Sequence, residues 1–119
     1  MSVNIIWLEP TATDISGTQI TEINFGDIVR PGSATESFKI GNTGASTAEQ
    51  VVLTADGADT EAVGWKSFSS DDATYDTSLS LADIAQDGIT PVTYVKTDIP
   101  ADGTTGSHST SLKISYVFV

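Results

Sequence analysis

Residues Phe25 to Leu53 read FGDIVRPGSATESFKIGNTGASTAEQVVL, and this stretch decides the fold class. It contains two strand-like runs, 33–40 and 48–55, joined by a glycine-rich turn at 41–44. Because successive side chains of a β-strand point to opposite faces, each run can bury one row and expose the other. The expected buried rows are Phe38 and Ile40 in the first run, and Val51, Leu53 and Ala55 in the second. The pattern predicts a hairpin or a corner of a β-sandwich.

The rest of the chain continues in short strand-like runs, separated by turn signals rich in Gly, Pro, Asp and Asn. We expect further strands at 3–8, 18–25, 63–68, 75–81, 90–97 and 110–119. No amphipathic helical period is visible in the sequence. Many short strands without helices predict a sandwich or a barrel.

A Phe-Gly pair, a Pro-Gly turn, and an Asn-Thr-Gly turn ahead of a Val-Val-Leu strand form a recognisable pattern. The residues that carry it are Phe25, Gly26, Pro31, Gly32, Phe38, Ile40, Asn42, Thr43 and Gly44. The pattern resembles the immunoglobulin-like domains of the hydin type, and similar small domains occur on the capsids and tails of tailed bacteriophages. The resemblance implies an all-β fold, an immunoglobulin-like β-sandwich of about seven to nine antiparallel strands.

Length and charge limit the classes of function. A chain of 119 residues suits one domain over 1–119, within which 1–19 are an N-terminal strand or arm. There is no cysteine, which excludes disulfides and thiolate chemistry. Sixteen acidic residues face five basic ones, and the net charge of -11 disfavours nucleic acid and anionic membranes as partners.

The N-terminal run 3–8 is apolar on both faces of the expected strand. Such a strand is covered on two sides, either within the sandwich or between the sandwich and a partner. For the second case, the expected partner-binding residues are Val3, Ile5, Ile6, Trp7 and Leu8. The run is too short for a signal peptide or a membrane span, so we expect a protein made in the cytoplasm.

Candidate chemistry is sparse. The only histidine, His108, lies among ordinary serines without a nucleophile motif, and one histidine cannot build a histidine-based zinc site. The acidic run 56–61 places its glycine too early for a calcium loop, so we expect an acidic solvent loop there. Trp65 is expected in the core, with a sugar-stacking platform as the alternative. We expect no catalytic residues, no metal and no cofactor.

Two functions of different classes follow from these observations. The first is a non-enzymatic virion structural protein, a capsid decoration or cement protein that binds the major capsid protein or other virion proteins, with a tail position as its variant. Copies on the lattice would then lie near one another as a homo-oligomer. The second is a carbohydrate-binding or adhesion module at the cell surface or secreted, in which Trp65, Tyr75 or Tyr94 stacks on sugars. The final strand also suggests a third idea, strand exchange with a partner.

Overall fold

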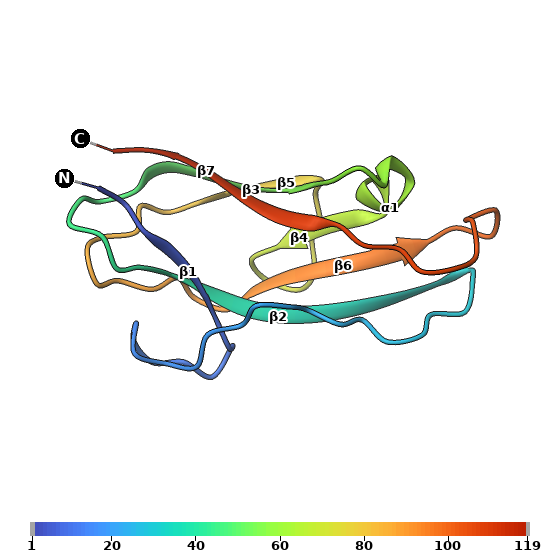
Figure 1. The fold of residues 1–119 in the computed structure, drawn as a ribbon, viewed down its shortest axis with the longest axis horizontal. Helices are drawn as coiled ribbons and strands as arrows, with labels where there is room; N and C mark the ends of the chain where they lie inside the picture. The colour runs from blue at the N-terminus through green and yellow to red at the C-terminus, as the bar shows by residue number, and fades with distance from the viewer. Residues whose placement is uncertain (1, 119) are drawn as a thin grey trace.

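The computed structural model describes residues 2–118. Its elements in chain order are β1 (Ile5–Leu8), β2 (Gly32–Asn42), β3 (Glu49–Asp56), α1 (Thr60–Gly64), β4 (Lys66–Ser69), β5 (Ser78–Leu81), β6 (Thr93–Ile99) and β7 (Ser111–Val117). The strands form a four-stranded sheet of order β1-β2-β6-β4 and a three-stranded sheet of order β5-β3-β7. Every pairing is antiparallel, and the two sheets lie as two layers along the long axis (Figure 1). The fold is all-β, as the alternation predicted.

The connection between β2 and β3 is a corner. β2 pairs with β1 and β6, whereas β3 pairs with β5 and β7, so the two strands belong to different sheets. The turn at 43–48 therefore carries the chain from one layer to the other. Of the two alternatives that the sequence left open, the corner is the observed one.

The core lies between the two layers, where the alternation placed it. Phe38 and Ile40 of one sheet and Leu53 of the other are completely buried. Val51 is buried beside them, and Ala55 is half-buried at the edge of the cluster. Each fully buried large apolar side chain stabilises the fold by about 1.5–3 kcal/mol. These rows, which the sequence predicted, hold the sheets together.

A buried asparagine fixes the corner. The Asn42 side chain is fully buried and donates to the carbonyl oxygens of Ser46 at 2.8 Å and Ile84 at 3.0 Å. Its Oδ1 accepts from the backbone N–H groups of Gly44 at 2.9 Å and Asn4 at 3.3 Å. One side chain thus ties the turn to β1 and to the chain around Ile84. We call this cluster the Asn42 corner.

Two expected strands differ in the structure. The expected strand at 18–25 does not form, and the chain stays outside any strand until Gly32, with a turn at Gly26; Ile23 and Phe25 nevertheless pack against the core as their alternation indicated. A strand needs hydrogen bonds from a neighbour, and only Gln19 bridges β1 here. The run at 63–68 begins inside α1, because Asp59 caps this helix by accepting from the Ala62 N–H at 3.1 Å.

Candidate functional site

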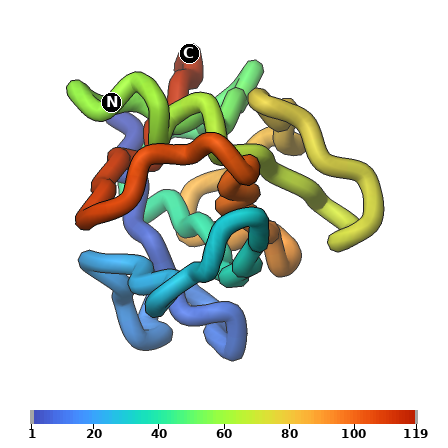
Figure 2. The backbone as a smooth tube through the Cα atoms, turned by 90° about the vertical axis from the view of Figure 1, so that its right-hand side faces the viewer, coloured from blue at the N-terminus to red at the C-terminus, as the bar shows by residue number. Residues whose placement is uncertain are grey.

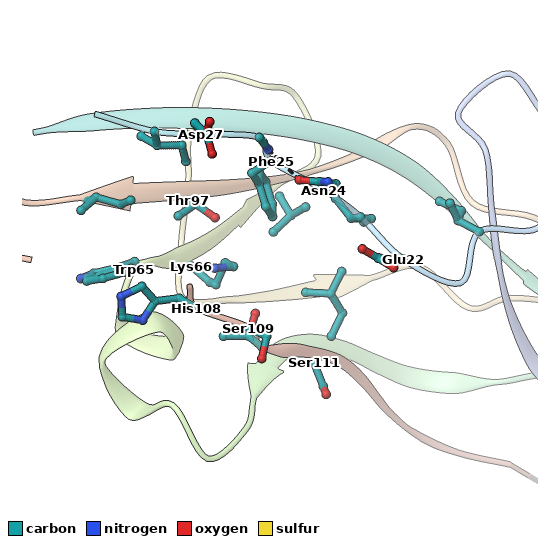
Figure 3. A pocket seen from close by; sticks show the side chains of 18 of the residues that line it. Glu22, Asn24, Phe25, Asp27, Trp65, Lys66, Thr97, His108, Ser109 and Ser111 are labelled. Carbon is teal, nitrogen blue, oxygen red and sulfur yellow. Dashed lines mark hydrogen bonds between the residues drawn. The ribbon is translucent and has the colours of Figure 1, made fainter. Parts of the chain in front are cut away.

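A groove opens between the two sheets along one side of the molecule, and we call it the open groove. Its wider part has a volume of about 730 Å³, with residues 20–28 on one wall and 106–112 on the other (Figure 3). Its narrower part, of about 380 Å³, lies between β1 and β7. Trp7, Ser111 and Leu112 line both parts, so the two are neighbours. Figure 2 shows both walls on the same side of the molecule.

Both walls of the open groove carry unpaired backbone. β7 is an edge strand, since β3 is its only neighbour among the described residues. On the opposite wall, no backbone group of 21–31 bonds to another backbone group within residues 2–118. β7 and the irregular segment 21–31 therefore lie on either side of one groove with backbone N–H and C=O groups that have no backbone partner within residues 2–118.

Two polar side chains without partners lie in the wider part. Lys66 of β4 faces Thr97 of β6 across the sheet, and their side chains are 8% and 5% exposed. The Lys66 Nζ lies 5.4 Å from the centre of the Phe25 ring, and no ion pair to it occurs among the described residues. Burial lowers the pKa of Lys66. The buried Thr97 hydroxyl likewise has no hydrogen-bond partner in the part of the chain that the structure describes.

His108 closes one end of the open groove. Its Nδ1 lies 2.6 Å from Asp59 Oδ2, and its Nε2 lies 2.8 Å from the Thr104 carbonyl oxygen. The hydrogen bonds to Asp59 and then to Thr104 raise the pKa of His108, because the protonated ring can donate to both oxygens. Both ring nitrogens are engaged, so His108 presents no free nitrogen to a serine hydroxyl.

The acidic run at 56–61 does more than face solvent. Asp59 caps α1 and binds His108, and the hydrogen bond from the Ala62 N–H is the main reason its pKa is lowered. Glu61 accepts from the Thr104 N–H at 3.2 Å. These acids remain exposed or partly exposed, as expected, but two of them also make contacts, and Glu61 lies in α1 rather than in a loop. Within residues 2–118, no group of three or more Asp, Glu and His side chains could hold a metal ion.

The expected partner-binding residues all belong to the first strand or its approach. Leu8 is completely buried, Ile6 lies near Gly41, and Val3 packs against the core. Ile5 and Trp7 line the open groove, and the Trp7 ring lies 5.4 Å from the Phe38 ring. The structure thus pairs this strand with β2 at one edge of the four-stranded sheet. Contact with a partner stays a prediction for Ile5 and Trp7.

The aromatic candidates for sugar stacking are largely occupied. Trp65 is 8% exposed and packs edge-on against His108, with the ring centres 4.7 Å apart. This is the buried position that the sequence predicted. The Tyr75 ring lies under the Lys96 ammonium at 5.2 Å, and Tyr94 is half-buried.

An exposed apolar cluster ends the second sheet. Tyr116, Val117 and Phe118 are 36%, 45% and 51% exposed at the end of β7. The sequence predicted a strand at 110–119, and the structure places its residues Ser111–Val117 at a sheet edge. We call these three residues the β7 patch.

The chain matches no protein-family profile, no curated protein and no solved structure significantly. The site is therefore interpreted from its own residues. No helix within residues 2–118 has the length and apolar character needed to cross a membrane.

Proposed function

We propose that the protein is a non-enzymatic structural protein of a virion, a decoration protein that attaches to the coat lattice through the β7 patch and the open groove. The observation that carries the proposal is the β7 patch, three consecutive apolar residues that are all exposed at the end of an edge strand. Contiguous exposed apolar surface marks sites of contact with other proteins. On a lattice, many modest contacts of this kind add up because the copies bind together.

We further propose that the domain is immunoglobulin-like. In such domains one sheet has the order A-B-E-D and the other contains C, F and G. The strands β1, β2, β6 and β4 would take the places of A, B, E and D, and β3 and β7 those of C and F. β5 lies beside β3, where variable-type domains add a strand. The place of G, beside β7, holds no described strand.

A binding role agrees with the site. His108 engages both ring nitrogens, and the acids nearest to it serve as a helix cap and a loop contact. In the open groove, the buried Thr97 hydroxyl has no hydrogen-bond partner within residues 2–118, which favours binding over proton transfer. We therefore assign contact with another protein, and no reaction, to this surface.

Quantitative mass spectrometry of purified particles from the native source tests the virion role. A decoration protein is expected at a copy number close to that of the major coat protein. A few copies per particle would indicate a tail or portal position, and absence would refute the virion role.

The contact surface is tested separately with two matched variants. Tyr116→Ser with Phe118→Ser should reduce attachment to particles, whereas Val29→Ser, at an isolated side chain that is 85% exposed, should not. Circular dichroism of both proteins checks that the fold is retained. Equal attachment of both variants would refute the β7 patch as the contact.

A further inference from the structure

We propose that the open groove accepts an extended segment of a positively charged partner protein, which adds as a β-strand to the free edge of β7. The inference deepens the proposed function, and it rests on that function only for the premise that the domain binds another protein. It identifies the kind of partner and the way in which the partner is held.

The backbone on both walls is suited to an added strand. An edge strand directs every second N–H and C=O away from its only neighbour, which makes it a template for another chain. β7 has this property over Ser111–Val117, and the facing segment 21–31, which turns at Gly26 and Pro31, makes no backbone–backbone hydrogen bond among residues 2–118. A strand laid between them would bond to β7 and face the free backbone groups of 21–31. Main-chain hydrogen bonds of this kind supply the affinity when a peptide joins a sheet.

The side chains suit the same occupant. Every second side chain of an added strand points toward the core and needs an apolar surface. The open groove offers one, formed by Trp7, Phe25, Leu112 and Ile114, which are half-buried against the core.

Polar side chains in the wider part of the groove could also donate hydrogen bonds to the backbone of an inserted segment. The Thr97 hydroxyl is buried without a hydrogen-bond partner among the described residues, the Lys66 side chain makes no ion pair there, and a buried polar group is costly unless it is hydrogen-bonded. The carbonyl oxygens of an inserted segment would accept hydrogen bonds from them. The occupant would thereby satisfy groups that the chain leaves unsatisfied.

Charge selects the class of partner. Glu22, Asp27 and Asp56 line the open groove as exposed acids, and Lys113 is the exposed lysine among its lining residues. The whole chain carries a net charge of -11, so a second copy would be repelled. A segment with Lys or Arg on its outward side chains complements this rim. The occupant is therefore a basic partner and not another copy of this chain.

A tethered strand tests the proposal. Appending an Asn-Gly turn and the strand Lys-Val-Thr-Val-Lys-Val-Thr to the full chain places the probe beside β7 at an effective concentration in about the millimolar range. We expect Tm to rise by roughly 5 °C or more. Hydrogen exchange at the amides of β7 and of 21–31 should slow by about tenfold or more. Emission from Trp7 and Trp65, the two tryptophans, should shift because both line the groove.

Two matched extensions separate strand addition from mere apolar contact. Replacing every second residue of the probe strand by Pro removes N–H donors, and this extension should leave Tm and exchange unchanged. Replacing the two Lys by Glu keeps the strand but should lower the gain in Tm. Unchanged exchange at β7 with the first probe, in a protein whose β2 and β3 amides remain protected, would overturn the proposal. So would an equal gain with the Pro-containing extension.

The test of strand addition and the test of the virion role can fail independently of each other. Protected β7 amides together with absence from particles would refute the virion role and leave strand addition standing. Abundance in particles together with unprotected β7 amides would support the virion role and refute strand addition.

Discussion

The Asn42 corner and the open groove differ in how well their buried polar groups are hydrogen-bonded. In the corner, the fully buried Asn42 side chain makes four hydrogen bonds that join three parts of the chain, although the Ser46 hydroxyl has no partner within residues 2–118. In the groove, Lys66 is 8% exposed and forms no ion pair among the described residues, and the buried Thr97 hydroxyl has no hydrogen-bond partner there. A satisfied polar group fixes one structure, whereas an unsatisfied one lowers stability until a ligand arrives. The corner serves the fold, and the groove is available for binding.

The largest expected effect is at the corner. Asn42→Asp replaces a donor by a carboxylate oxygen that faces the carbonyl oxygens of Ser46 and Ile84. We expect the free energy of unfolding to fall by about 3 kcal/mol or more, because a buried charge then faces two carbonyl oxygens and keeps only the N–H groups of Gly44 and Asn4 as donors. Urea unfolding followed by tryptophan fluorescence measures it. Asn24→Asp, at an exposed turn, is the control and should change little. Equal losses would contradict the special role of the corner.

The next effect concerns the close approach of the N-terminal segment to the corner. A Cβ at Gly44 would lie against the Ser2 carbonyl oxygen and 2.8 Å from the Val3 Cα. Since these are backbone atoms, Gly44→Ala forces the segment to move, and we expect a loss of about 1–3 kcal/mol. Gly64→Ala is the matched control, because the added methyl group would meet no atom within 4 Å. Thermal unfolding of both variants checks the difference, and an unchanged Tm for Gly44→Ala would show that the approach is not tight.

A substitution in the groove should raise the free energy of unfolding, whereas the two substitutions at the corner lower it. Lys66→Met removes a buried ammonium without a partner and should raise the free energy of unfolding by about 1 kcal/mol. Lys113→Met, at the exposed β7 position, should leave it unchanged. A loss of stability in Lys66→Met would mean that Lys66 already has a stabilising role.

The pH dependence of the same variant gives a second test. The folded pKa of Lys66 is lowered by burial, so between that pKa and about 10.4 the unfolded chain binds more protons. The wild type therefore gains stability as pH rises through this range, and its deficit relative to Lys66→Met should shrink. Urea unfolding at pH 7 and at pH 10 compares the two proteins.

The smallest effect is expected at His108. Its folded pKa is raised, chiefly by Asp59, so its contribution is complete below the unfolded pKa of about 6.5 and is lost as pH rises through the folded pKa. The Tm difference between wild type and His108→Gln should therefore be larger at pH 5.5 than at pH 8.5. Water reaches both His108 and Asp59, so the shift should be small. A difference independent of pH would show that the contact with Asp59 does not involve the charged ring.

Particular residues show what the sequence predicted well. The alternation around Phe38 and Leu53 located the core rows, because burial of one strand face leaves a period of two in the sequence. The helix α1 was missed, although Asp59 ahead of Ala62 is a capping signal that could have revealed it. The contact between Asp59 and His108 spans 49 residues and leaves no local signal.

The sequence by itself determined that this protein is all-β, which residues form its core, and that the turn at Asn42 ends one strand run before the next begins. Those features depend on local periodicity and on turn chemistry, which neighbouring residues carry. Only the tertiary structure decided that β2 and β3 lie in different sheets, that β7 is an edge of the described sheet, and that 21–31 stay unpaired within residues 2–118. Strand pairing depends on which distant segment supplies the hydrogen bonds, and alternation alone does not specify that partner.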